Sequence, residues 1–192
     1  MAMTEQDAQT PSHSPEEMRA LLLRQRKAFT VAAPEDMDAR ENRLNRAIFL
    51  LTDHADDFAK AVSADFGHRS HEQTLLTDIG PSVNALKHAR KHFRQWARSE
   101  KRSPMFPLGL LGAKASVEYG PKGVVGVVAP WNFPVGMVMV PMAGVLAAGN
   151  RALVKPSEFT PETSALLARL VAEYFHEEEI TVVTGGPEVG KA

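Results

Sequence analysis

Three short groups of polar residues and glycines interrupt the apolar second half of the sequence. They are Pro130-Trp131-Asn132, Lys155-Pro156-Ser157-Glu158 and Thr184-Gly185-Gly186. An asparagine amide is an uncharged hydrogen-bond donor, and two prolines close to it, at 130 and 134, restrict the backbone that carries it. A lysine and a glutamate three positions apart offer a cation and a carboxylate side by side. These residue types suit the recognition of a polar ligand rather than the filling of a core.

Each group follows an apolar run that is predicted to be a strand, and helices separate the runs. The pattern strand, helix, strand, helix, strand is typical of a buried parallel sheet in an α/β fold. Because the carboxyl ends of parallel strands meet at one edge, the three groups should lie close together. The pattern therefore favours half of a dinucleotide-binding domain, although "GVVGVV" at 123–128 is not a G-x-G-x-x-G phosphate loop.

The first half of the chain is predicted to be helical and the extreme N-terminus to be disordered. Residues 1–14 are expected to form a disordered tail, and residues 15–100 an N-terminal helical segment. Ser14 fits an N-cap and Pro15 the first helical position. Gly67 is expected to end one of these helices.

Residues 101–192 are predicted to form a partial dinucleotide-binding domain together with a strand of an oligomerisation region. A connection rich in proline and glycine comes first. The remaining elements are expected as strands at 115–119 and 124–129, a helix at 134–148, a strand at 151–155, a helix at 161–174 and a last strand in "ITVVTG".

Composition excludes several classes of function. The net charge of −1 gives no reason to expect a nucleic acid or an anionic membrane as partner. The chain has no cysteine, which excludes disulfides, thiolate metal sites and a cysteine nucleophile within it. The apolar window 133–148 is shorter than the roughly 20 residues of a spanning helix, so a buried helix is expected. The polar N-terminus favours a cytoplasmic protein.

A histidine pair and a basic stripe in the helical segment are interpreted as a solvated helix face. His88 and His92 are four residues apart, but "HARKH" lacks the glutamate of a zinc protease motif, so no metal site is predicted. The neighbouring basic residues lack interleaved aromatic residues, and no nucleic-acid interface is expected.

The sequence resembles the aldehyde dehydrogenase superfamily. The resemblance is carried by "GPKGVVGVVAPWNFP", "LAAGNRALVKPSEFTPETS" and "VVTGG", in the family's order and spacing, and covers roughly residues 15–192. The "KPSE" form and "PMAGVLAAGN" look like the class 3 branch, and "SADFGHRS" looks most like bacterial coniferyl aldehyde dehydrogenases. The implied fold is α/β, with N-terminal helices followed by an incomplete Rossmann-like parallel sheet.

The resemblance implies a covalent mechanism in which a cysteine thiolate attacks an aldehyde and hydride passes to NAD(P)⁺. Asn132 matches the asparagine that donates its amide to the oxyanion formed in that attack. The alternative for Asn132 is the N-cap of a helix that begins at Phe133 or Pro134.

The resemblance also implies cofactor-binding roles around the sheet edge, with NAD as cofactor and NADP possible. Lys155 and Glu158 match residues that hold the adenosine ribose; the alternative is a strand-end lysine and a glutamate in the first turn of a helix. Pro130 and Trp131 match residues that line the cofactor cleft, although Trp131 could instead pack in the core. Gly186 could let the backbone pass near the adenine, or belong to an ordinary turn.

The departures from the family predict an N-terminal fragment of such an enzyme. The motifs of the nucleophilic cysteine and of the general-base glutamate are absent, so the chain by itself is expected to be inactive. The complete enzyme is expected to be a homodimer that acts on a small aldehyde, such as coniferyl aldehyde, with no nucleic-acid or membrane partner. The alternative is a stand-alone, non-catalytic module that binds a nucleotide or another protein.

Overall fold

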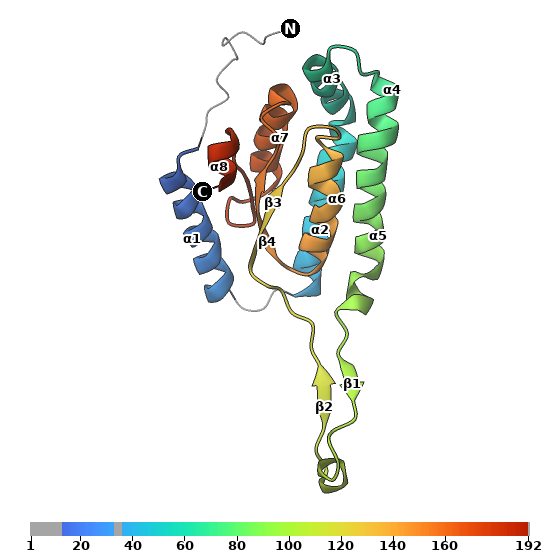
Figure 1. Cartoon of the computed structure of the whole chain (residues 1–192). Helices are drawn as coiled ribbons and strands as arrows, with labels where there is room; N and C mark the ends of the chain where they lie inside the picture. The colour runs from blue at the N-terminus through green and yellow to red at the C-terminus, as the bar shows by residue number, and fades with distance from the viewer. Residues whose placement is uncertain (1–12, 33–35, 192) are drawn as a thin grey trace.

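The computed structural model describes residues 13–32 and 36–191 of the chain. Its helical elements and strands follow in chain order (Figure 1): α1 Pro15–Val31, α2 Met37–Asp53, α3 Ala55–Phe66, α4 His71–Thr74, the π-helical turn η1 Leu75–Ile79, α5 Gly80–Trp96, β1 Glu100–Arg102, the 3₁₀ turn η2 Leu108–Leu111, β2 Ala115–Val117, β3 Val124–Val128, α6 Gly136–Ala147, β4 Arg151–Lys155, α7 Pro161–Tyr174, β5 Ile180–Val182 and α8 Pro187–Lys191.

The predicted start of the first helix is confirmed. The Ser14 hydroxyl accepts from the Glu17 amide at 3.2 Å, and the Ser14 amide donates to the Glu17 carboxylate at 2.8 Å, which together form a capping box. Of the predicted tail, residues 1–12 lie outside the described residues, whereas the His13 amide donates to the carbonyl of Thr184. Gly67, with φ at 70°, ends α3 as expected.

The strand, helix, strand, helix, strand pattern is confirmed as a parallel sheet with the strand order β3-β4-β5. β4 has the predicted bounds, and β3 and β5 lie within theirs. The helix predicted over 134–148 is α6, which begins two residues later, at Gly136. The α/β fold class is therefore confirmed.

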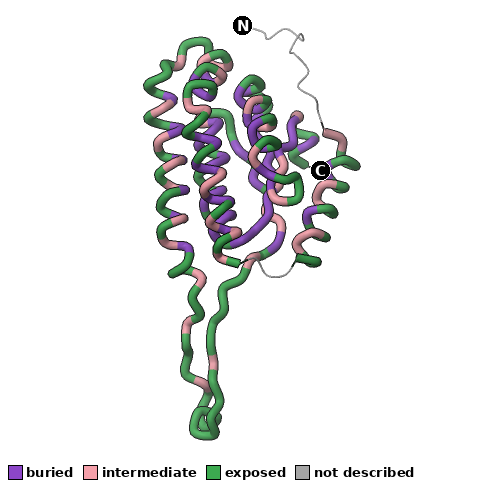
Figure 2. The backbone as a smooth tube through the Cα atoms, turned by 180° about the vertical axis from the view of Figure 1, so that it is seen from behind, coloured by how far each residue is buried: buried purple, intermediate pink, exposed green. Residues whose placement is uncertain are grey.

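Helices cover both faces of the sheet, and β4 shows the alternation that this requires. Leu153 packs toward α1 with Met18, in a small cluster. Ala152 and Val154 point the other way, into the main core that α2, α3, α5, α6 and α7 share. Figure 1 shows α1 on one side of the strands and α2, α5 and α6 on the other. Figure 2 shows the buried residues gathered where these helices face one another.

A two-stranded arm extends from the body between α5 and β3 (Figures 1 and 2). β1 pairs antiparallel with β2, with Glu100 opposite Val117 and Arg102 opposite Ala115. The sequence predicted a strand at 115–119 but only a connection from residue 101 onward, so β1 was missed. The tip of the arm exposes Met105, Phe106 and the turn η2.

In the part of the chain that the structure describes, none of the helices combines the length and the apolar character that crossing a bilayer requires.

Glu179, just before β5, ties helix α2 to the sheet. Its carboxylate accepts from Arg43 at 2.8 Å and from Arg46 at 2.8 and 2.9 Å, and its side chain is only 15% exposed. Burial favours a higher pKa for Glu179, but the hydrogen bonds from Arg46 and Arg43 outweigh it and lower the pKa from 4.5 to about 2.

This cluster makes the stability of the chain depend on pH. The pKa of Glu179 is lower in the folded state, so its contribution is complete above about 4.5 and is lost as the pH falls toward about 2. The shift corresponds to roughly 3 kcal/mol of unfolding free energy. We expect Glu179→Gln to flatten the pH dependence of unfolding by urea between about pH 4.5 and about pH 2, the window between the two pKa values.

Glu173→Gln, at an exposed ion pair on α7, is the matched control and should keep the wild-type slope. Parallel profiles for wild type and Glu179→Gln would contradict the assignment.

Candidate functional site

The register of the sheet brings the ends of its strands to one edge. Val128 lies opposite Lys155, and Val154 opposite Val182. The ladder continues one residue further on each side, because Ala129 donates to the Lys155 carbonyl and Val183 to the Val154 carbonyl. The segments that begin at Pro130, Pro156 and Thr184 therefore leave the sheet at the same edge. The predicted meeting of the three polar groups is confirmed for the backbone.

Asn132 lies between β3 and α6, in the exposed segment 130–132. Among the residues that the structure describes, none forms a hydrogen bond with its side-chain amide. Helix α6 begins at Gly136 with Val135 as N-cap, so the alternative in which Asn132 caps this helix is wrong. The amide is instead free to donate to a ligand.

Trp131 and Pro130 precede Asn132 on the same exposed segment. Trp131 is 51% exposed, which rules out the alternative of simple core packing. Its ring lies 6.1 Å from that of Phe66, centre to centre, so the end of α3 supports one side of it. Pro130 is also exposed. Both residues are placed where a ligand at the strand edge could contact them.

Two residues that the sequence did not indicate, Arg69 and Asp78, form hydrogen bonds with the backbone of the segment that carries Asn132. The Arg69 guanidinium donates to the carbonyl of Asn132 at 2.9 Å. The Asp78 side chain is fully buried, and its carboxyl accepts from the amide of Gly136 at 2.7 Å. Burial raises the pKa of Asp78, while the hydrogen bond from Gly136 and the charge of Arg69 oppose that rise. Neither residue belongs to a local motif, so only the tertiary structure reveals them.

Lys155 and Glu158 form an ion pair at the end of β4. The Lys155 ammonium lies 2.9 Å from the Glu158 carboxylate, and only 8% of the Lys155 side chain is exposed. Burial favours a higher pKa for Glu158, but its own backbone amide and Lys155 lower the pKa overall. Lys155 is the last residue of β4, as the alternative states, but α7 begins at Pro161 with Thr160 as N-cap, so placing Glu158 in its first turn is wrong. The pair offers a donor and an acceptor, which matches the hydroxyl groups of a ribose.

Gly186 lies at the start of α8, beyond the end of β5. Its amide donates to the Glu188 carboxylate at 2.9 Å. A Cβ atom at this position would approach that carboxylate to 2.8 Å, so glycine permits the contact. Glu188 is a further residue at this edge that the sequence did not indicate.

An open pocket of about 700 Å³ lies between α1 and the sheet. It is lined by Arg19 and Arg26 of α1, by the second half of β3, by Lys155 and by α8. Glu16 also lines the pocket and Lys155 is paired with Glu158, so Arg19 and Arg26 are the cations that give it a net positive charge. Pockets of this size accept small organic ligands. Within the described ranges 13–32 and 36–191, no group of three histidine, cysteine or acidic side chains is arranged so that it could hold a metal ion.

Comparison with known proteins relates this arrangement to one family. The model of the aldehyde dehydrogenase family matches residues 2–192. A probable coniferyl aldehyde dehydrogenase of Caulobacter vibrioides is 53% identical over 176 residues, which are 91% of this chain and 36% of that protein. The coniferyl aldehyde dehydrogenase of a Pseudomonas species is 51% identical over 175 residues, with the same coverage.

A solved structure agrees with these sequence relatives. The substrate-bound state of Staphylococcus aureus AldH superposes with a TM-score of 0.84 at 29% identity, covering 91% of this chain and 37% of that one. The chain thus spans little more than a third of the proteins it matches. The family model, the relatives and the shared fold agree, and the chain belongs to the aldehyde dehydrogenase family.

Proposed function

We propose that this chain forms the N-terminal part of an NAD(P)-dependent aldehyde dehydrogenase, which oxidises an aldehyde to a carboxylic acid. The observation that carries the proposal is Asn132, whose exposed and unengaged amide lies at the carboxyl edge of the parallel sheet. Coniferyl aldehyde is the proposed substrate, because two relatives at 53% and 51% identity carry that name.

In this mechanism Asn132 stabilises the oxyanion that forms when a thiolate attacks the aldehyde carbon. The amide is suited to this task because it donates a hydrogen bond without losing a proton. The thiolate must come from outside this sequence, which holds no cysteine. Exposure of Asn132 leaves its amide accessible to a part of the enzyme that supplies the thiolate.

The cofactor, when bound, supplies the hydride acceptor. On this proposal Lys155 and Glu158 hold the adenosine ribose, Pro130 and Trp131 line the cleft, and Gly186 lets the backbone approach the adenine. The pairing of Lys155 with Glu158 supports these roles, since both groups are held where β4 ends.

We expect the complete enzyme to be a homodimer. The tip of the arm supports this expectation, because Met105, Phe106, Leu110 and Leu111 are each at least 76% exposed there. An apolar surface of this kind is typical of a contact between subunits.

The 192-residue chain by itself should not oxidise aldehydes. Without a cysteine it lacks the nucleophile that begins the covalent mechanism. We expect no NADH or NADPH when the purified chain is mixed with coniferyl aldehyde and either coenzyme. A chimaeric enzyme, in which this chain replaces the matching 175 residues of the Pseudomonas relative, serves as the active control. Coenzyme reduction by the chain alone would contradict the proposal.

Asn132→Ala should slow the chimaeric enzyme without weakening its cofactor binding. Loss of one oxyanion donor lowers kcat by about 10²- to 10³-fold. Cofactor affinity should remain close to wild type, because the amide acts on the reacting carbonyl. Asn84→Ala, at an exposed position on α5, is the matched control. Loss of NAD⁺ binding at nearly unchanged kcat would instead make Asn132 a cofactor residue.

Glu158→Gln should narrow the preference of the chimaeric enzyme for NAD⁺. A carboxylate gains charge-assisted hydrogen bonds from a ribose 2′-hydroxyl but repels a 2′-phosphate. The substitution also frees Lys155 from its ion pair, which favours the phosphate. We expect kcat/KM to fall modestly with NAD⁺ and to rise with NADP⁺. Glu162→Gln, an exposed carboxylate four residues away, is the control. If the ratio of the two kcat/KM values does not change, Glu158 does not face the 2′ position.

A further inference from the structure

We propose that Arg69 and Asp78 are positioning residues that orient Asn132 by fastening both ends of the segment 132–136. Arg69 holds the first end through the carbonyl of Asn132, and Asp78 holds the last through the amide of Gly136. The inference rests on the proposed role of Asn132 as an oxyanion donor, and it assigns the residues that give this donor its orientation.

Arg69 is held tightly enough to act as an anchor. Its guanidinium carbon lies 3.8 Å from the centre of the Phe66 ring and 5.6 Å from that of Phe133, and only 12% of the side chain is exposed. These cation–π contacts restrict the movement of the guanidinium while its nitrogens still donate. One nitrogen donates to the Asn132 carbonyl at 2.9 Å. A planar, multidentate cation can stack and donate at once, which a lysine cannot do.

Asp78 anchors the other end through an unusually close approach of side chain and backbone. A Cβ atom on residue 136 would lie 3.1 Å from the bonded carboxyl oxygen, so glycine at this position leaves the oxygen its place. Asp78 belongs to the π-helical turn η1, a wider turn of the kind that often accompanies functional sites. Val135, the N-cap of α6, provides no side-chain cap, so Asp78 supplies the missing acceptor.

Arg69 and Asp78, which bind the two ends of the segment 132–136, also lie next to each other. Arg69 and Asp78 are 3.6 Å apart, between a guanidinium nitrogen and the second carboxyl oxygen. In the part of the chain that the structure describes, these two atoms have no hydrogen-bond partner. The pair therefore closes a ring that runs from Asn132 through Arg69 and Asp78 to Gly136 and back along the chain. This ring fixes the backbone of Asn132 from its carbonyl side and leaves the side-chain amide free.

A double-mutant cycle in the chimaeric enzyme separates this role from a purely structural one. Arg69→Met keeps the apolar stem and removes the hydrogen bonds. Misplacing a reacting group by about 1 Å costs up to about 100-fold, so we expect kcat to fall about 10- to 100-fold. The KM for NAD⁺ should stay close to wild type. In the Asn132→Ala background, the same substitution should change kcat by less than about twofold, because it acts through the missing amide.

Further variants distinguish a catalytic effect of Arg69→Met from a defect in folding. Arg169→Met removes an exposed arginine from an ion pair on α7 and should leave kcat unchanged. Arg69→Lys keeps a cation near Asp78, so it should fold even where Arg69→Met does not, and it should also lower kcat. Asp78→Asn keeps an acceptor for Gly136 but removes the charge that faces Arg69. It should reduce kcat less than Arg69→Met and show the same dependence on Asn132.

The outcomes separate failure of this inference from failure of the proposed function. If Asn132→Ala leaves kcat unchanged, Asn132 is no oxyanion donor, and the positioning role falls with it. If Asn132→Ala slows the enzyme but Arg69→Met and Arg69→Lys do not, only the positioning role is overturned. An equal loss from Arg69→Met with and without Asn132 would also overturn it, since the effect would then be independent of the amide.

Discussion

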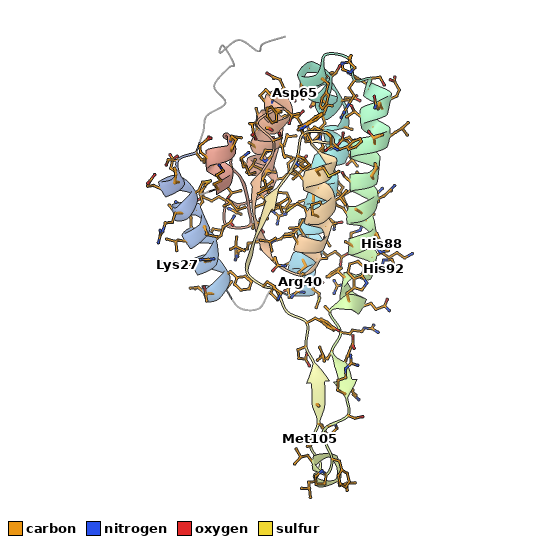
Figure 3. The ribbon with its side chains drawn as sticks, viewed as in Figure 1. Lys27, Arg40, Asp65, His88, His92 and Met105 are labelled. Atoms are coloured by element: carbon orange, nitrogen blue, oxygen red, sulfur yellow. The ribbon has the colours of Figure 1, made fainter. Side chains whose placement is uncertain are left out.

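Two carboxyl groups from the N-terminal helices cap the crossover helices of the sheet, and the arrangement of the edge depends on them. Asp78 accepts from the amide of Gly136 at the start of α6. Asp65, at the end of α3, accepts from the amides of Glu162 and Thr163 at the start of α7 (Figure 3). Neither helix has a side-chain cap of its own. Since the first amides of a helix need acceptors and attract negative charge, these contacts join the helical segment and the sheet into one unit.

Most of the fold could be predicted because the signals for it are local. The capping box of α1, the left-handed glycine after α3 and the short apolar strand β4 each depend on a few adjacent residues. Asp65 and Asp78 act on amides 97 and 58 residues away, and no local pattern shows that. The residues around Asp65 in the sequence do not indicate that this aspartate caps α7. β1 was missed because "EKR" has no apolar alternation, and its pairing with β2 comes from the far side of a turn.

For the candidate site too, the positions of the backbone segments could be predicted from the sequence, whereas the side-chain contacts could not. That Asn132, Lys155 and Gly186 would leave the sheet at one edge follows from the rule that parallel strands end together. Which side chains hold them does not follow from that rule. Arg69 reaches Asn132 from a loop 63 residues earlier, and α8 packs against Lys155 through Gly190. Side-chain partners depend on how the helices pack against one another. The sequence pattern predicts which face of a helix or strand is buried, but not which element packs against that face.

Charge is distributed differently around Lys155 and Glu158 than around Asn132, and this difference fits the different proposed roles of the two places. Lys155 is largely buried and holds the more exposed Glu158 in an ion pair, so the pair presents mainly its carboxylate to a ligand with hydroxyl groups. Near Asn132, Arg69 is turned inward and faces Asp78, while a neutral amide points to solvent. A cation placed at the position of that amide would bind any anion, including a carboxylate product, in the ground state. A neutral donor on a fixed backbone instead gains most where negative charge develops during reaction. If Asn132 is the oxyanion donor that we propose, the inward ion pair supplies the rigidity of a charged contact and keeps its charge away from the reacting carbonyl.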